Sequence, residues 1–400
     1  MNTKQQEAYD AFKLGTNIVL TGPAGTGKSY TLHHMFSWAE KARKRCGITA
    51  STGLSAFLIG GRTIHSFLGI GLGKKPVDLT AQQVKHKNKP VYTKLLTLDI
   101  LVIDEISMID SELLDYISEF LKIVRNSELP FGGVQVVLCG DFCQLPPVEG
   151  KFCFFADVWK ESNFHTIVLE DLIRQGSDSS FQKILKELRW GCSKDTLAEL
   201  KKCMTTTFAE GIIPTKLYST NKNVDNINLA ELEKVKKTGA VCQTYKSTYQ
   251  GSSKSWCQHV PEAVELCEGA QVMCTTNLQG TEIFNGTRGV VVKLGPTEVH
   301  IKLVDGQVTQ IPFTKIACLD NDKLTVTFMP LRLAYAISIH KSQGLTLDAL
   351  EIDVGPSIFE YGQAYVAISR AKTLGSIRIV NIVSGSFRVH PLVKDFYNGL

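Results

Sequence analysis

Short apolar runs alternate with amphipathic stretches over the first 175 residues of the chain. The runs are rich in β-branched residues, which is typical of strands buried on both faces of a parallel sheet. The stretches between them repeat apolar residues at the three- and four-residue spacing of a helix. We therefore predict a doubly wound α/β domain, with strands at NIVL (17–20), GITAS (47–51), ILVIDE (100–105), VQVVLCGD (134–141) and TIVLE (166–170).

The pattern changes between about residues 240 and 330, where alternating residues and turn signals replace the helical stretches. Asn285-Gly286 and Asp305-Gly306 are typical of hairpins, and the second pair fits a two-residue type I′ turn. Strand and helix patterns alternate on either side, at 181–204, 215–220, 221–236, 331–340, 349–355, 360–371 and 376–382. We therefore expect a small antiparallel β domain inserted into a second α/β domain.

These patterns place the chain in the α/β class and set its domain boundaries. The first domain is expected at 1–175, the second at 176–240 plus 331–400, and the inserted β domain at 241–330. A length of 400 residues suits two large domains and a small one.

Composition adds little to this picture. The formal net charge of +5 permits a nucleic-acid surface but does not require one. Eleven cysteines without a zinc-type pair or a dense regular spacing indicate a reducing compartment rather than a disulfide framework. The first residues, MNTKQQEAYDAF, contain no signal core, and no apolar run is long enough to span a membrane. We expect an intracellular protein without a membrane partner, and the sequence does not distinguish nucleus, mitochondrion, cytoplasm or a viral replication compartment.

The segment GPAGTGKS, from Gly22 to Ser29, matches the phosphate-binding pattern G-x-x-x-x-G-K-[S/T]. It follows a predicted strand and opens a predicted helix, a context that disfavours the alternative of a glycine-rich turn with an exposed lysine. Glycines let backbone N–H groups approach phosphates, Lys28 can reach the β and γ phosphates, and the Ser29 hydroxyl can hold Mg²⁺. The predicted ATP contacts are Gly22, Pro23, Ala24, Gly25, Thr26, Gly27, Lys28 and Ser29.

Two further strands end in polar residues that suit the same site. Asp104 and Glu105 end the run ILVI, so one carboxylate can bind Mg²⁺ and the other can polarise the attacking water; we assign the metal to Asp104. The strand VQVVLCGD leads into FCQLPP, which places Gln144 where it can sense or orient that water. Taken alone, Gln144 fits equally well in a capped loop stiffened by two prolines.

Phosphoryl transfer also needs cations that stabilise the developing charge. Arg174 in LIRQ lies where the first domain gives way to the second, and Arg370 in YVAISRA starts or follows a helix of the second. Surface arginines are usually solvated, which is the alternative. Arginines that face a nucleotide held by the first domain would couple domain closure to hydrolysis.

Together these segments resemble the Pif-type (petite integration frequency) helicases of superfamily 1B, over almost the whole chain. The matching motifs, in order, are KQQEAYDAF, GPAGTGKS, ITASTGLSAFLIGG, RTIHSFLGIG, LVIDEISM, GDFCQLPPV, LIRQ, NGTRGVV, AISIHKSQGLTLD and GQAYVAISRA. The stretch SMIDSELLDYISEFLKIVR (107–125) resembles the signature of the Pif-type branch, with Ser118 where an acidic residue is usual and Phe120 where an aliphatic one is. The same stretch also has the pattern of an ordinary amphipathic helix.

The resemblance implies two RecA-like P-loop domains with ATP between them and an SH3-like β-barrel inserted in the second. It implies that Gln5 reads the adenine and that Gln343 and Gly344 link DNA contact to the γ-phosphate. By the same resemblance, the residues expected to contact single-stranded DNA are Ser51, Thr52, His65, Phe67, His340, Lys341 and Ser342. Such contacts go mostly to phosphates and base faces, so binding should depend on salt rather than on sequence.

A basic segment at about 72–95 occupies the position where relatives carry a small wedge that splits the duplex. It contains Lys74, Lys75, Lys85, Lys87, Lys89 and Lys94 against Asp78. A solvated loop explains the composition equally well. Arg288 in NGTRG is a further candidate for DNA contact, although a turn alone explains the adjacent glycines.

The expected function is an ATP- and Mg²⁺-dependent 5′-to-3′ DNA helicase acting in replication, repair, recombination or telomere maintenance, with G-quadruplexes and RNA–DNA hybrids as further candidate substrates. Its expected partners are single-stranded DNA and single-strand/duplex junctions, bound as a monomer, and a single-strand-binding protein. One alternative is an RNA helicase of the same superfamily, and the motifs SMIDSELL and TIHSFLGIG favour the DNA enzyme. The other is an ATP-gated clamp on single strands, which the combination of Gln144, Arg174 and Arg370 disfavours.

Overall fold

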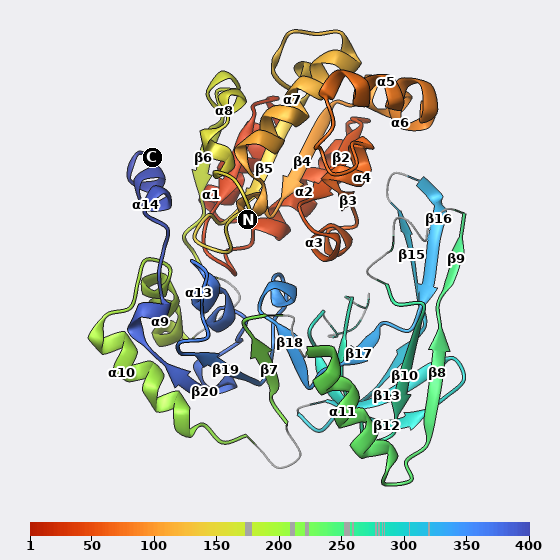
Figure 1. The fold of residues 1–400 in the computed structure, drawn as a ribbon, viewed down its shortest axis with the longest axis vertical. Coiled ribbons are helices and arrows are strands. Elements are labelled where there is room, and N and C mark those ends of the chain that lie inside the picture. The colour runs from red at the N-terminus through yellow and green to blue at the C-terminus, as the bar shows by residue number, and fades with distance from the viewer. Residues whose placement is uncertain are drawn as a thin grey trace. The chain divides into compact units, whose positions relative to one another are not determined.

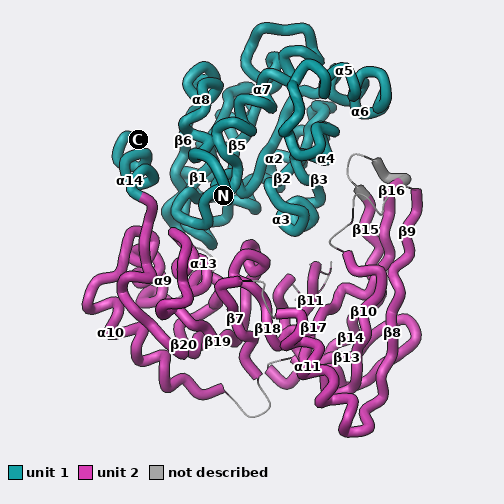
Figure 2. Tube along the Cα trace, in the orientation of Figure 1, with its two compact units in different colours: residues 1–174, 391–400 teal, residues 175–390 magenta. Residues whose placement is uncertain are grey.

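The computed structural model divides the chain into two units, residues 1–174 with 391–400 and residues 175–390 (Figure 2). It describes residues 1–172, 178–208, 213–220, 224–251 and, of 257–400, all but 258, 259, 277, 279, 280, 282, 284, 304, 319 and 320. Within this part of the chain, no helix combines the length and the apolar character needed to cross a membrane.

A six-stranded parallel sheet forms the centre of the first unit (Figure 1). Its strands lie in the order β3-β2-β4-β5-β1-β6, and every neighbouring pair is parallel. They are β1 (Ile18–Thr21), β2 (Cys46–Ala50), β3 (Arg62–Thr63), β4 (Ile100–Asp104), β5 (Gln135–Gly140) and β6 (His165–Val168). The five strands predicted from apolar runs are confirmed, and only the two-residue β3 was not expected.

Helices surround this sheet. Phe12 of α1 and Leu32 and Met35 of α2 share one buried core with strand residues such as Leu20 and Val102. The helices of this unit before residue 174 are α1 (Thr3–Lys13), α2 (Lys28–Lys41), α3 (Gly53–Leu58), α4 (Ile64–Leu68), α5 (Val77–Lys87), α6 (Lys89–Leu96), α7 (Ser111–Arg125) and α8 (Asp157–Glu161). Helix α7 buries Phe120, and the unusual Ser118 is buried beside it, where its hydroxyl accepts a hydrogen bond from Phe131 N at 3.0 Å.

The second unit contains a smaller parallel sheet in the order β18-β7-β19-β20. Its strands are β7 (Thr215–Tyr218), β18 (Ala336–Ser338), β19 (Leu350–Val354) and β20 (Ile377–Ile382). The helices of this unit include α9 (Ser179–Leu188), α10 (Lys194–Lys202), α11 (Val224–Lys236) and α13 (Gln363–Ile368). The second α/β domain is thus confirmed, with two helices where one helical stretch was predicted at 181–204.

The inserted segment folds into antiparallel sheets, and strands of two of these sheets share one buried core. Its strands are β8 (Cys242–Lys246), β9 (Thr248–Gln250), β10 (Ala263–Cys267), β11 (Gln271–Cys274), β12 (Arg288–Leu294), β13 (Glu298–Leu303), β14 (Val308–Pro312), β15 (Thr314–Cys318), β16 (Asn321–Phe328) and β17 (Leu331–Leu333). They form sheets of order β14-β13-β12-β11-β17, β15-β16-β9 and β10-β8. The antiparallel insertion is confirmed, while its likeness to an SH3 barrel remains a prediction.

Two details of this insertion differ from expectation. Leu303 N donates to Gln307 O at 2.7 Å, so the β13–β14 hairpin closes around a longer turn than the two-residue turn expected at Asp305-Gly306. Strand β17 pairs with β11, so the antiparallel sheet extends past the boundary expected at residue 330.

The C-terminal helix α14 (Pro391–Asn398) also differs from expectation, because it groups with the first unit rather than with the second domain. Phe396 stacks on Phe154 of the first unit with ring centroids 4.5 Å apart, and Val393 is buried. An amphipathic pattern shows that a helix must pack but does not show against which domain.

The structure also contains a disulfide that the cysteine count did not predict. Cys242 and Cys267 are bonded, with an S–S distance of 2.10 Å. They stand directly opposite each other in the antiparallel pair β8–β10, where facing side chains come close. Because 25 residues separate them in sequence, spacing alone gave no sign of the pairing.

Candidate nucleotide and nucleic-acid site

Strand order brings the three predicted chemical motifs to one edge of the first sheet. Strands β4, β5 and β1 are consecutive neighbours and run parallel. Their carboxyl ends lead into Asp104-Glu105, Asp141 and Gly22 respectively. The carboxyl edge of a parallel α/β sheet is the usual place for ligands, and here it collects a phosphate loop and three carboxylates.

The phosphate loop has the backbone that its glycines predict. Gly22 follows β1 with φ +146°, and a Cβ there would lie 2.2 Å from Leu169 O, so no side chain fits. Helix α2 begins at Lys28, which directs the helix N-terminus and its partial positive charge at the loop. Lys28 Nζ donates to Gly22 O at 2.7 Å and to Pro23 O at 2.9 Å, so the ammonium lies over the loop.

Asp104 and Glu105 form a tight turn at the end of β4. Glu105 adopts φ +53°, a left-handed conformation that costs about 1 kcal/mol for a residue with a side chain. Its N–H donates to Asp104 Oδ1 at 2.9 Å, which fixes the Asp104 carboxylate against the turn. Strained backbone is common at functional sites, and this strain supports a functional role for the pair.

Burial raises the pKa of the Asp104 carboxyl, while the Glu105 backbone N–H, the Cys139 thiol and the Lys28 ammonium oppose that rise. Cys139 lies on β5 beside β4, and burial raises the pKa of its thiol, so it donates to the carboxylate as a neutral S–H. The sequence by itself assigned no role to Cys139. Because side chains alternate along a strand, the position of Cys139 on β5 relative to Asp104 on β4 was the feature of the sequence that could have identified this contact.

Gln144 is almost fully buried in the loop after β5. Asp141 organises this loop, because its Oδ1 accepts from Cys143 N at 3.1 Å and its backbone O accepts from Gln144 N at 2.9 Å. The capped loop considered from sequence is therefore present, and it holds Gln144 at the same sheet edge as the phosphate loop. The capped-loop interpretation of Gln144 is therefore compatible with a role in orienting the attacking water.

Gln5 is buried against the phosphate loop, and both ends of its carboxamide have protein partners. Nε2 donates to Thr26 O at 3.2 Å, and Oε1 accepts from Asn2 N at 3.0 Å as part of the N-terminal cap of α1. Gln5 thus braces the loop in this structure. The carboxamide has a second N–H and a second oxygen lone pair, which are the groups that an adenine contact would use.

Three of the predicted DNA contacts of the first unit are Ser51, Thr52 and His65. Ser51 N donates to Asp104 O at 3.1 Å and Ser51 Oγ donates to Glu105 O at 3.0 Å, which ties this residue to the carboxylate turn. Thr52 caps α3 by accepting from Ser55 N. His65 is half-buried, and burial lowers the pKa of its imidazole, so it is neutral at pH 7.

Phe67 corrects one expectation, because its side chain is fully buried and cannot stack on a base in this structure. Its ring fills the space beside Gly47, where a Cβ would lie 2.4 Å from the ring. Lys94 Nζ lies 3.4 Å from the ring centroid and donates to Phe67 O, so Lys94 belongs to this packing and not to the basic surface. Phe67 was assigned by resemblance to a motif, which does not show the direction of each side chain.

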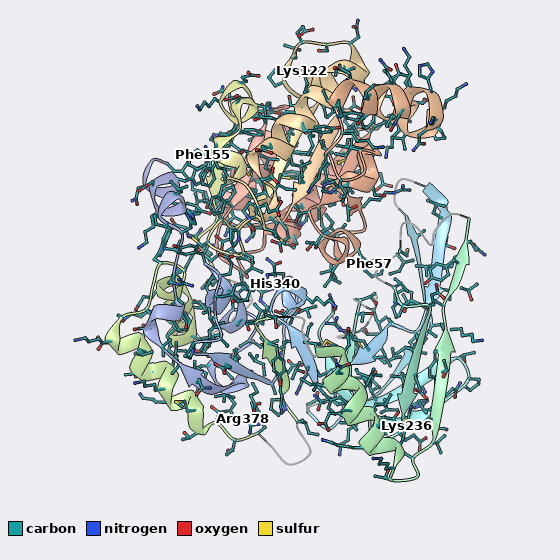
Figure 3. The ribbon with its side chains drawn as sticks, in the orientation of Figure 1. Phe57, Lys122, Phe155, Lys236, His340 and Arg378 are labelled. Carbon is teal, nitrogen blue, oxygen red and sulfur yellow. A yellow bond between two sulfur atoms is a disulfide. The ribbon has the colours of Figure 1, made fainter. Side chains whose placement is uncertain are left out.

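The predicted motif of the second unit forms a short turn at His340–Ser342, where Figure 3 labels His340. Lys341 is exposed, whereas Ser342 is buried and donates from Oγ to Ile339 O at 2.7 Å. Burial lowers the pKa of His340, so this imidazole too is neutral at pH 7. Only Lys341 therefore offers a formal positive charge from this turn.

Gln343 and Gly344 follow that turn. Gln343 is buried, and its Nε2 has no hydrogen-bond partner within the described residues. A buried amide donor without a partner is costly, and a functional role or a bound water or ion commonly explains one in a native structure. Gly344 adopts φ +77°, which turns the chain away from the motif.

Two arginines complete the predicted set. Arg370 is buried, and its guanidinium donates to Val366 O at 3.0 Å, Ser369 Oγ at 2.7 Å and Ser342 O at 3.4 Å. The solvated-surface alternative is therefore wrong for Arg370. Arg174 lies outside the described residues.

Arg288 is a second correction. Its side chain is buried and donates to Ile213 O at 2.7 Å and Thr215 Oγ1 at 3.1 Å, so it anchors β12 to the start of β7 rather than reaching DNA. Burial lowers its pKa to about 10.

Comparison with known proteins identifies the family. The family model described as PIF1-like helicase matches residues 1–195. The ATP-dependent DNA helicase Pif1 of Bdellovibrio bacteriovorus is 34% identical over 409 residues, covering 99% of this chain and 91% of that protein. The chain belongs to the PIF1-like helicase family. It is therefore an ATP-hydrolysing helicase, as its phosphate loop indicates.

Solved structures agree with this PIF1-like assignment. The crystal structure of Pif1 helicase from Candida albicans matches with a TM-score of 0.80 and 34% identity, covering 100% of this chain and 99% of that one. A Bacteroides Pif1 in complex with ADP-AlF3 and ssDNA matches with a TM-score of 0.67 and 28% identity, covering 100% and 96%. These matches confirm the RecA-like α/β architecture. The chain spans 61% of PIF1 from Emericella nidulans and 63% of human PIF1, so those proteins are longer.

Proposed function

We propose that this PIF1-like helicase moves 5′ to 3′ along single-stranded DNA and unwinds duplex ahead of it. The observation that carries the proposal is that each unit links a predicted DNA motif to a predicted nucleotide motif. In the first unit, Ser51 is bonded to the backbone of Asp104 and Glu105. In the second, Ser342 O accepts from Arg370. A motor needs such links, because DNA contact and ATP hydrolysis must alter each other.

The chemistry assigned to the nucleotide site follows from the groups at the sheet edge. Lys28 stabilises phosphate charge, and Glu105 polarises the attacking water that Gln144 orients. Ser29 is exposed on the first turn of α2 and Asp104 lies at the end of β4, and both supply the hard oxygen ligands that Mg²⁺ prefers. The ion would neutralise charge on the β and γ phosphates when it is bound.

Relatives support DNA as the substrate. The Bdellovibrio protein is named a DNA helicase, and the Bacteroides structure contains ssDNA together with a nucleotide analogue. We propose that this chain binds single strands and single-strand/duplex junctions as a monomer, with G-quadruplexes and RNA–DNA hybrids as further substrates and a single-strand-binding protein as a partner. We also propose that Arg174 and Arg370 supply the positive charge that hydrolysis needs.

Strand displacement on two partial duplexes tests the proposal. One duplex carries a 5′ single-stranded tail and the other a 3′ tail of equal length, and both are incubated with ATP and Mg²⁺. We expect unwinding only from the 5′ tail. Unwinding from the 3′ tail alone would contradict the polarity, ATP hydrolysis without unwinding of either would indicate the single-strand clamp, and preference for RNA tails would indicate an RNA helicase.

The basic segment gives a second prediction about unwinding. Lys85, Lys87 and Lys89 are exposed at the end of α5 and the start of α6, with no carboxylate paired to them among the described ion pairs. Reversing all three to glutamate should lower the unwinding rate about tenfold, because each phosphate contact contributes to binding at the junction. Single-strand-stimulated ATPase should fall much less.

The matched control reverses three exposed lysines of the second unit, Lys186, Lys194 and Lys201. This variant has the same change of net charge and should unwind at close to the unmodified rate. Equal losses of unwinding and ATPase in the α5–α6 variant would show a general binding defect and contradict a wedge role.

A further inference from the structure

The last helix of the chain contacts the nucleotide loops of the first unit. The second unit occupies residues 175–390, so the chain leaves the first unit once and returns to it at α14 (Figure 2). The ring of Phe396 lies against Phe154 and against Phe142, with centroids 4.5 and 5.1 Å apart. Phe142 belongs to the loop that follows β5 and carries Gln144. The aromatic contacts therefore hold α14 on the loop whose Gln144 we assign to orienting the attacking water.

The hydroxyl of Tyr397 reaches two polar groups at the sheet edge. It lies 2.6 Å from Thr21 Oγ1 and 3.5 Å from Asp141 Oδ1. Thr21 is the last residue of β1, immediately before Gly22, and Asp141 directly follows β5. Both side chains are fully buried, and buried polar groups are stable only when they have hydrogen-bond partners.

The direction of these hydrogen bonds follows from the acceptor. A carboxylate only accepts, so Tyr397 donates its single proton to Asp141 Oδ1 and accepts the proton of Thr21. Asp141 Oδ1 also accepts from Cys143 N, and its backbone O accepts from Gln144 N. One hydroxyl therefore joins the strand that leads into the phosphate loop to the turn that presents Gln144.

We propose that Tyr397 is a positioning residue for ATP hydrolysis, which sets the spacing between the phosphate loop and the Gln144 loop. This inference rests on the proposed nucleotide site. Positioning matters here because phosphoryl transfer depends mainly on geometry and on fixed charges, so small displacements of either loop lower the rate.

The test substitutes Tyr397→Phe, which removes the hydroxyl and keeps the ring. We expect kcat for single-strand-stimulated ATP hydrolysis to fall about tenfold, with KM for ATP and the affinity for single-stranded DNA changed less than twofold. Tyr116→Phe is the matched control, because Tyr116 donates to Thr80 Oγ1 at 2.8 Å elsewhere in the same unit. It removes an equivalent tyrosine–threonine bond and should leave kcat unchanged.

A double-mutant cycle with Thr21→Val separates positioning from a general loss of stability. If the two hydroxyls act through each other, the double variant should lose no more kcat than the more affected single variant. Fully additive losses, or a Tyr397→Phe enzyme with kcat within twofold of the unmodified one, would overturn the inference. Both results leave the proposed function standing if the unmodified protein hydrolyses ATP, whereas an unmodified protein without turnover would overturn both.

Discussion

Replacement of Lys28 by alanine should lower single-strand-stimulated ATP turnover about a thousandfold. The ammonium lies over the phosphate loop, bonded to Gly22 O and Pro23 O, and it is the cation that the loop itself supplies for the phosphates. Its partners are carbonyls of its own loop, so its loss should change the folded structure little. Steady-state ATPase at saturating single-stranded DNA, together with circular dichroism, measures both effects.

Lys41→Ala is the control for Lys28→Ala, because Lys41 is exposed at the other end of α2. It should retain full turnover and the same thermal unfolding. Near-normal turnover in the Lys28 variant would remove the assignment of this loop to phosphate.

The second large effect is expected for Glu105→Gln. The amide keeps the size and most hydrogen-bonding capacity of the carboxylate but cannot take a proton from water, so turnover should fall about a thousandfold. ATP should still bind, because phosphate contacts come from the loop and from Lys28. Nucleotide binding by equilibrium titration and single-turnover hydrolysis distinguish the two steps.

Asp104→Asn is the informative comparison for Glu105→Gln. Because we assign the metal to Asp104, this variant should lose Mg²⁺-dependent nucleotide binding together with turnover. If Glu105→Gln bound nucleotide as weakly as Asp104→Asn, Glu105 would not be the base. The assignment of the two carboxylates would then be reversed or wrong.

Local patterns predicted the phosphate loop and, apart from the two-residue β3, the strands of both parallel sheets. Apolar runs such as ILVI are long enough only for buried strands, and the glycines of GPAGTGKS allow backbone conformations that other residues resist. Near residue 240, alternating residues and turn signals replace the helical stretches, and this change predicted the antiparallel insertion. These features depend on residues close together in sequence, which is why they could be predicted.

Residue roles that depend on side-chain direction were harder to predict. Phe67 and Arg288 belong to motifs that resemble DNA contacts, yet both side chains are buried in their own units. Lys94 belongs to a basic segment by composition but packs on Phe67. Neither the composition of a segment nor the order of the motifs shows which side chains point into a core.

The sequence by itself determined the α/β class, the order of the motifs and the residue types that carry the chemistry, since hydrophobic periodicity and turn chemistry act over a few residues. Only the tertiary structure decided which strands are neighbours, and hence that Gly22, Asp104 and Asp141 meet at one sheet edge. It also decided that α14 returns to the first unit and that Tyr397 reaches Thr21, a contact across 376 residues. Such contacts arise from packing and hydrogen bonding between distant segments, which leave no periodic trace in the chain.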